Sequence, residues 1–371
     1  MILQGDVLQQ LKQLESNSFD GSFSDPPYAL GFMGKKWDAA LPSVAVWEEV
    51  YRVLKPGAYL LAFGGSRTFH RLFCSIEDAG FRLVDTLTWL HGQGFPKAAN
   101  ISKAIDKAAG ASRPIIGQGG RPCGGMGINT FGHWDKQLSN PITAPATPQA
   151  AQWAGYHTAL KPAWEPLALA QKPLDGTYAH NATTHGCGAL NINGCRIPAE
   201  KPMGWNGKTS QADNRTSYGM RGVAEPTDAE GRYPANLILD DVAGEQLGKP
   251  SRFFYCAKAS RREREHGLDG LPTSPAYSEA NPQPNRDNSP QKAIHNTHPT
   301  VKPIALTKYL ATLILPPPRE TPRRLLTPYS GVASEMIGAY QAGWDEVVGI
   351  ELDPGYIAIA ERRINAHTQI K

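Results

Sequence analysis

The sequence has few cysteines and no long hydrophobic run. Its 371 residues include five cysteines, an odd number without paired C-x-x-C spacing. This pattern indicates neither a disulfide framework nor a zinc site, so we expect reduced thiols and no bound metal. No run of about 18 apolar residues is present to span a membrane, and the N-terminus lacks the pattern of a signal peptide. We therefore expect a cytoplasmic protein without a membrane partner.

Composition indicates a folded chain with no strong charge bias. Apolar residues make up 40% of the sequence, which is enough for a sizeable core in one large or two modest domains. The formal net charge of +4 permits a polyanionic partner without demanding one. Charge alone is therefore weak evidence for nucleic-acid binding.

Strand and helix patterns alternate in residues 1–110. The strand pattern MILQGD is followed by a helix that begins at Val7 and by the strand pattern FDGSFSD. A second helix is expected to stop at Lys55-Pro56-Gly57, before the apolar strand AYLLAFGG, and Asn100 is a candidate helix N-cap. Alternation of this kind predicts a mostly parallel α/β sheet.

Residues 111–297 have a different composition. They are rich in Gly, Pro, Asn and Thr, with isolated aromatic residues and short strand patterns such as NLILD and RFFYCAK. We interpret this segment as an irregular insertion that ends in a mobile loop at 272–297. Alternation returns in residues 298–371, where a helix begins near Pro303 and the strand patterns RRLLTP and EVVGIELD follow.

The C-terminal block has the layout of a nucleotide-binding half. A strand leads to a turn at Gly331, then to a helix and a second strand that ends at Glu351. In doubly wound sheets such a turn lets a ligand approach closely, and the acid can bind ribose hydroxyls. If the N-terminal strand continues this half, the sheet closes as a circular permutation. Gly331, Glu351, Asp6 and Asp25 then lie at the carboxyl ends of adjacent strands, where open α/β sheets bind ligands.

The segment FSDPPYAL, residues 23–30, places an acid, two prolines and a tyrosine directly after an apolar strand. Two adjacent prolines stiffen the backbone, so Asp25 and Tyr28 keep a fixed relation. The carbonyls of Pro26 and Pro27 remain free to accept hydrogen bonds. From these residues alone the segment is either a simple turn or a rigid acceptor clamp.

The order of DPPY, the helix opened by HPTVKP and the turn TPYSG resembles the amino-group DNA methyltransferases of the permuted, β-type order. The stretches WLHGQGFPKAANISKAID, WEPLALAQKPL and SRFFYCAKASRRER are similar to stretches of related phage and bacterial methylases. The resemblance implies a Rossmann-like, circularly permuted fold with S-adenosyl-L-methionine as cofactor. It implies a catalytic half at 1–110, an inserted target-recognition region at 111–297 and a cofactor half at 298–371.

The resemblance also implies roles for individual residues. Asp25 and the Pro26 carbonyl accept hydrogen bonds from the exocyclic amine of a flipped base, Tyr28 stacks on that base, and Pro27 keeps the clamp rigid. The implied cofactor-binding residues are Asp6, Asp25, Lys302, Thr327, Tyr329, Ser330, Gly331 and Glu351. The candidate substrate-binding residues are Phe95, Lys97, Arg261 and Arg262.

Some of these residues have a second interpretation. Phe95 is either a second stacking face or a loop anchor, and Lys97 either contacts phosphate or is a solvated charge. The basic run that includes Arg261 and Arg262 either follows DNA phosphates or forms a solvated helix face. Thr327 departs from the acid that the family usually has before the proline of the cofactor turn. Its hydroxyl can accept a hydrogen bond from the cofactor ammonium, but without charge assistance.

The resemblance predicts a site-specific DNA methyltransferase that modifies adenine N6 in duplex DNA. Asp at the first clamp position favours adenine over cytosine N4. A cytosine-N4 enzyme, an enzyme acting on RNA or on a protein amide, and a catalytically weakened DNA-binding homologue remain open. The expected setting is the nucleoid of a bacterial or phage-infected cell, with double-stranded DNA as partner; a homodimer and a cognate restriction enzyme remain open as further partners.

Overall fold

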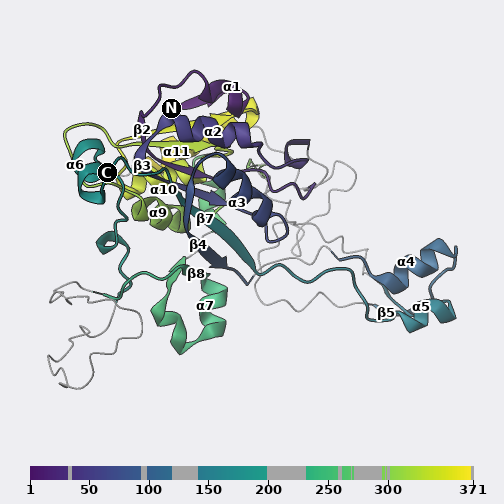
Figure 1. Cartoon of the computed structure of the whole chain (residues 1–371). Coiled ribbons are helices and arrows are strands. Elements are labelled where there is room, and N and C mark those ends of the chain that lie inside the picture. Colours follow the sequence, from purple (N-terminus) through teal and green to yellow (C-terminus); the bar gives the residue numbers. More distant parts are fainter. Residues whose placement is uncertain are drawn as a thin grey trace, which may run out of the picture.

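The computed structural model describes residues 1–31, 36–92, 98–118, 141–198, 231–257, 261–268, 270, 295–296, 298 and 301–368. They form a large sheet with helices on both faces, and a smaller module that projects from it (Figure 1). In this part of the chain, no helix has the length and apolar character needed to cross a membrane.

The main sheet has the strand order β1-β11-β10-β2-β3-β7-β4-β8-β9. The strands are β1 (Ile2–Gln4), β2 (Phe19–Ser24), β3 (Leu54–Phe63), β4 (Arg82–Leu90), β7 (Trp164–Gln171), β8 (Leu237–Asp240), β9 (Tyr255–Ala257), β10 (Arg324–Pro328) and β11 (Glu346–Glu351). β7 runs antiparallel to both of its neighbours, and the other pairings of this sheet are parallel. Strands from the two ends of the sequence are thus neighbours, and the predicted permuted α/β fold is confirmed.

Helices cover both faces of this sheet (Figure 1). One face carries α1 (Val7–Leu11), α2 (Val44–Val53) and α3 (Phe69–Asp78), and the other carries α9 (Ile304–Leu313), α10 (Ser334–Ala342) and α11 (Pro354–Thr368). Successive strand residues divide between the two faces: Leu60 and Leu326 belong to the first core, Leu61 and Leu325 to the second, and all four are fully buried. Burying each such leucine stabilises the fold by about 1.5–3 kcal/mol.

One expected helix stop lies inside a strand. α2 ends at Val53 and β3 begins at once with Leu54, so Lys55-Pro56-Gly57 belongs to β3. The register between β2 and β3 shifts in this region, and Gly57 has a φ of +77°. The three residues therefore form a bulge that glycine can accommodate, which is why they have the composition of a turn.

Residues 111–297 are only partly separate from the sheet, because they supply β7, β8 and β9. This segment also contains α6 (Tyr178–His185), α7 (Asp241–Leu247) and α8 (Arg261–Glu265). The loop expected at 272–297 lies outside the described residues, apart from His295 and Asn296.

The projecting module contains α4 (Ile101–Ala108), β5 (Ile115–Gln118), β6 (Pro141–Thr143) and α5 (Pro148–Gln152) (Figure 1). Asn100 caps α4 by accepting from the Lys103 nitrogen, which confirms the expected N-cap. At the centre of the module Asp106 pairs with Arg113 and accepts hydrogen bonds from the nitrogen and hydroxyl of Thr147. A buried carboxylate thus joins α4 to the segment that leads into α5.

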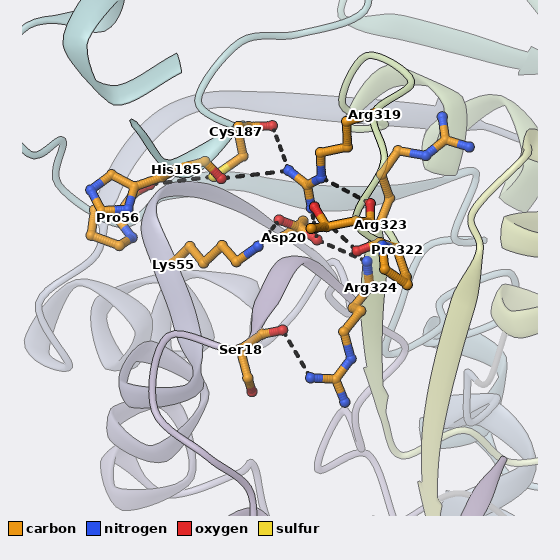
Figure 2. Close-up of polar contacts among 12 residues, drawn as sticks. Ser18, Asp20, Lys55, Pro56, His185, Cys187, Arg319, Pro322, Arg323 and Arg324 are labelled. Carbon is orange, nitrogen blue, oxygen red and sulfur yellow. Dashed lines mark hydrogen bonds and ion pairs between the residues drawn. The ribbon is translucent and has the colours of Figure 1, made fainter. Parts of the chain in front are cut away.

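A second buried carboxylate lies at the amino ends of the central strands (Figure 2). Asp20 in β2 is 2% exposed and accepts from Lys55 Nζ at 2.6 Å and from the Arg324 nitrogen at 2.8 Å. Arg319 pairs with the same carboxylate at 2.6 Å and donates to the Gly186 carbonyl at 3.0 Å. Asp20 therefore connects β2, β3 and β10 with the end of α6.

Candidate active site

The clamp segment begins where β2 ends, beside the end of β10. The Ser24 hydroxyl donates to the Pro328 carbonyl at 3.0 Å, which ties the two strand ends together. At this point the chain order of the sheet reverses, since β11 and β3 lie on opposite sides of the β10–β2 pair. Open α/β sheets bind ligands in the crevice at such a reversal.

Asp25 is held by a lysine and a tyrosine. Tyr28 donates its hydroxyl proton toward Asp25 Oδ1 at 2.7 Å, and Lys302 Nζ donates to Asp25 Oδ2 at 2.8 Å. Lys302 is 6% exposed and lies 4.5 Å from the centre of the Phe63 ring. Burial lowers the pKa of Lys302, but the charges of Asp25 and Glu165 outweigh it and raise that pKa. The ammonium therefore stays charged and keeps a positive charge beside Asp25.

Glu165 of β7 completes this cluster. Its Oε2 lies 3.0 Å from the Tyr28 hydroxyl and 3.2 Å from Lys302 Nζ, and its Oε1 lies 3.9 Å from His91 Nε2. Burial, together with the charges of Asp25 and Glu165, raises the pKa of Tyr28 well above its ordinary value. The phenol is therefore neutral at physiological pH.

The backbone around Tyr28 is fixed from two sides. Asp38 accepts hydrogen bonds from the nitrogens of Tyr28 at 2.7 Å and Leu30 at 3.2 Å. The Thr68 hydroxyl donates to the Tyr28 carbonyl at 2.8 Å. The rigidity expected from the two prolines is therefore extended by hydrogen bonds to residues that follow the clamp.

The glycine turn after β10 is tight and closely packed. The Ser330 nitrogen donates to the Ile350 carbonyl at 2.9 Å, and the Gly331 nitrogen donates to Glu351 Oε2 at 2.9 Å. Gly331 has a φ of +50°, and a Cβ there would lie 3.1 Å from His298 Nε2. A side chain at this position would be strained and would crowd the turn. Thr327 is fully buried and donates its hydroxyl to the Val348 carbonyl at 3.2 Å.

Two more acids lie at neighbouring strand ends. The Gly5 nitrogen donates to the Glu351 carbonyl at 2.9 Å, which joins the end of β1 to the end of β11. Asp6 caps α1 by accepting from the Gln9 nitrogen at 3.1 Å. Burial, and then the charge of Asp6, raise the pKa of Tyr329 in the turn after β10. The residues expected to bind the cofactor thus lie at one edge of the sheet, where Lys302 donates a hydrogen bond to the Asp25 carboxylate.

The expected substrate-binding residues are not placed. Phe95 and Lys97 lie outside the described residues, and nothing is described for the side chains of Arg261 and Arg262 at the start of α8. Arg264, in the same helix, donates to the His298 carbonyl at 2.6 Å. This hydrogen bond therefore connects α8 to the backbone at His298, four residues before Lys302.

Curated proteins with similar sequences are methyltransferases. The type II methyltransferase M.HindIII of Haemophilus influenzae is 23% identical over 238 residues, which cover 52% of this chain and 65% of that protein. M.HpaI of Haemophilus parainfluenzae, also a type II methyltransferase, is 32% identical over 109 residues, or 27% of this chain and 35% of that protein. The putative methylase YubD of Escherichia coli is 32% identical over 95 residues, or 24% and 41%. The resemblance to the amino-group DNA methyltransferases is confirmed.

The chain spans less than two thirds of the length of each of these three proteins. No family model matches the chain. Among solved structures, M1.HpyAVI aligns over 98% of both chains with 10% identity and a TM-score of 0.42. The PvuII DNA methyltransferase, described as cytosine-N4-specific, aligns over 98% of this chain and 85% of its own, with 13% identity and a TM-score of 0.46.

The sequence patterns did not single out two further acids at this edge, the half-buried Glu165 and the buried Glu335. Glu165 follows Trp164 at the start of an apolar strand. An acid within an apolar strand was the sequence signal that could have indicated a functional role. Glu335 lies in the first turn of α10, is 5% exposed, and its Oε1 has no hydrogen-bond partner among the residues that the structure places. Burial, followed by the charge of Asp25, raises the pKa of Glu335 to about 7.

Proposed function

We propose that this chain is an S-adenosyl-L-methionine-dependent DNA methyltransferase that methylates the exocyclic N6 of adenine in duplex DNA. One observation carries the proposal. Asp25, at the end of β2, is a neighbour of the Gly331 turn after β10, at the reversal of strand order. An acceptor suited to an amine and a turn suited to a nucleotide cofactor therefore share one crevice.

The acceptors address the difficulty of the reaction. The lone pair of an exocyclic base nitrogen is delocalised into the ring, so the nitrogen is a poor nucleophile. The Asp25 carboxylate and the Pro26 carbonyl would each accept a hydrogen bond from one N–H group of this amine. These two hydrogen bonds favour a tetrahedral nitrogen in the transition state. Because Asp38 and Thr68 fix the backbone at Tyr28, the clamp would need little rearrangement.

The residues at the strand ends fit the cofactor. The Gly331 turn would admit it, and Glu351 and Asp6 would bind its hydroxyl and base groups. Ser330 Oγ is buried and has no hydrogen-bond partner among the described residues, so it is available to a ligand. Acids outnumber Lys302 at this edge, which suits a cationic ligand. The bound cofactor supplies the methyl group, already activated on a sulfonium.

The substrate must reach this edge as a flipped base, because the target amine is inside the duplex. We assign sequence recognition to the parts of residues 111–297 that lie outside the sheet. Among them, β5, β6 and α5 project from the sheet together with the preceding helix α4 (Figure 1). Loops and short elements can enter a groove, whereas the sheet cannot. Exchange of these parts with those of a relative, with β7, β8 and β9 kept, is expected to change the methylated sequence; an unchanged site would reject the assignment.

The deciding experiment combines labelled cofactor with unmethylated DNA and nucleoside mass spectrometry. We expect label in N6-methyladenine. Label confined to N4-methylcytosine would refute adenine as the target base but would leave the proposed role of the Asp25 clamp standing. No label in DNA would refute the proposed function. Asp25→Ala is expected to abolish transfer while calorimetric cofactor affinity stays within about tenfold, because the clamp acts mainly in the transition state.

A further inference from the structure

Glu165 lies in the stretch WEPLALAQKPL, for which no role has been assigned. Because β7 is antiparallel, its first residues lie at the carboxyl edge of the sheet, and Glu165 pairs in register with Trp89 of β4. Its Oε2 is within 3.0 Å of the Tyr28 hydroxyl. Glu165 and Asp25 therefore both lie within hydrogen-bond distance of the Tyr28 hydroxyl.

Tyr28 has one hydroxyl proton and two carboxylate neighbours. Its oxygen lies 2.7 Å from Asp25 Oδ1 and 3.0 Å from Glu165 Oε2. It can donate to only one of them at a time. One of its lone pairs accepts from Lys302 Nζ at 3.1 Å, and the other remains able to accept a proton. Because the raised pKa keeps the phenol neutral, Tyr28 can give up its proton to one carboxylate only while taking one from the other.

The proposed reaction requires such a transfer. Methylation of an amine leaves a nitrogen that carries two hydrogens, the new methyl group and a positive charge. One N–H bond must then break, and Asp25 is the acceptor already bonded to it. A protonated Asp25 is a poor acceptor for the next substrate, so it must lose the proton before another turnover.

We infer that Tyr28 and Glu165 form a relay that carries this proton away from Asp25. The inference rests on the proposed function. The product N–H bond breaks and the proton binds Asp25; that proton then moves to the Tyr28 oxygen while the Tyr28 hydroxyl proton moves to Glu165 Oε2. Asp25 returns to a carboxylate, Tyr28 remains a neutral phenol and Glu165 becomes a carboxylic acid, so protons and charge balance.

The surroundings of Glu165 support this direction. Lys302 Nζ contacts Asp25 at 2.8 Å and Glu165 at 3.2 Å, so the same ammonium faces whichever carboxylate is ionised. On the far side, His91 Nε2 lies 3.9 Å from Glu165 Oε1, and its side chain is 13% exposed. Burial lowers the pKa of His91, which keeps its ring neutral beside Glu165. The Glu165 side chain is itself 23% exposed, so it can release the proton directly to solvent.

Glu165→Gln tests the relay because glutamine keeps the size and the acceptor oxygen of glutamate but cannot bind the proton. Turnover on unmethylated plasmid DNA is expected to fall about 100-fold, with cofactor and DNA affinities within about twofold. Tyr28→Phe keeps the ring but removes the hydroxyl, and should cause a similar loss. The double variant should be no slower than the slower single variant, since both changes interrupt one relay.

Glu165→Asp keeps a titratable carboxylate and is expected to recover at least about tenfold over Glu165→Gln. Multiplying losses in the double variant, or a loss matched by weaker cofactor or DNA binding, would overturn the relay in favour of a structural role. An active wild type with an equally active Glu165→Gln variant refutes the relay alone. A wild type that labels no DNA refutes the proposed function, and the relay with it.

Discussion

Replacement of Asp20 by asparagine is expected to destabilise the fold by about 3 kcal/mol. The substitution keeps the side-chain size but removes the charge that Lys55 and Arg319 both face (Figure 2). Removing one partner of a buried ion pair costs about 3–5 kcal/mol, because the other charge stays behind. The side chains of Lys55 and Arg319 are 22% and 19% exposed, so water screens part of their charge and the lower end of that range applies.

Thermal unfolding followed by circular dichroism measures this effect. At about 2 °C per kcal/mol for a chain of this size, the Tm should fall by about 6 °C. Asp345→Asn is the matched control, because Asp345 also pairs with an arginine, Arg323, at 2.8 Å, but its side chain is 42% exposed. Exposed pairs contribute at most about 1 kcal/mol, so its Tm should change by about 2 °C or less. Equal shifts in the two variants would refute the argument that burial sets the cost.

Three further predictions concern the C-terminal half. Because burial raises the pKa of Glu335 from 4.5 to about 7, the wild type loses stability as pH rises through that range. Glu335→Gln should therefore be more stable than wild type at pH 8, by up to about 3 kcal/mol, and close to it near pH 4.5; a pH-independent difference in urea unfolding would contradict this. Gly338→Ala should destabilise by about 1–3 kcal/mol, since the new Cβ would lie 2.3 Å from Thr307 Oγ1, and an unchanged urea midpoint would count against this packing. Gly331→Leu and Glu351→Ala should each weaken calorimetric binding of S-adenosyl-L-methionine, the first by filling the turn and the second by removing hydrogen bonds; unchanged affinity in both would reject the proposed cofactor site.

Local chemistry made much of this fold predictable. Asn100 could be assigned as an N-cap because the bond that it makes spans only three residues. The strands that end at Gln4, Pro328 and Glu351 are short apolar runs followed by a polar or glycine turn, and their parallel pairing follows from the helices between them. The positions of Asp6, Asp25, Gly331 and Glu351 at one edge then followed from the rule for strand ends.

Contacts between distant segments were not predictable in this way. Glu165 reaches Tyr28 only because β7 enters the sheet antiparallel between β3 and β4, and nothing in the local pattern of β7 specifies that place. The turn-like composition of Lys55-Pro56-Gly57 indicated a boundary, but pairing with β2 keeps these residues in a strand. In both cases a partner more than 30 residues away decides the outcome.

The central position of β2 has a consequence for synthesis of the chain. Its Asp20 bonds to Arg324, 304 residues later, so the ribosome must add about 300 residues before β2 gains its second neighbour. At 5–20 residues per second this takes on the order of 15–60 s. During that time β2, buried at every position in the finished fold, has an unpaired edge. Asp20 places a charge within that edge, and a charge on an unpaired strand edge discourages pairing with other nascent chains. Asp20, which stabilises the completed sheet, is thus also expected to reduce aggregation of the incomplete chain through the β2 edge.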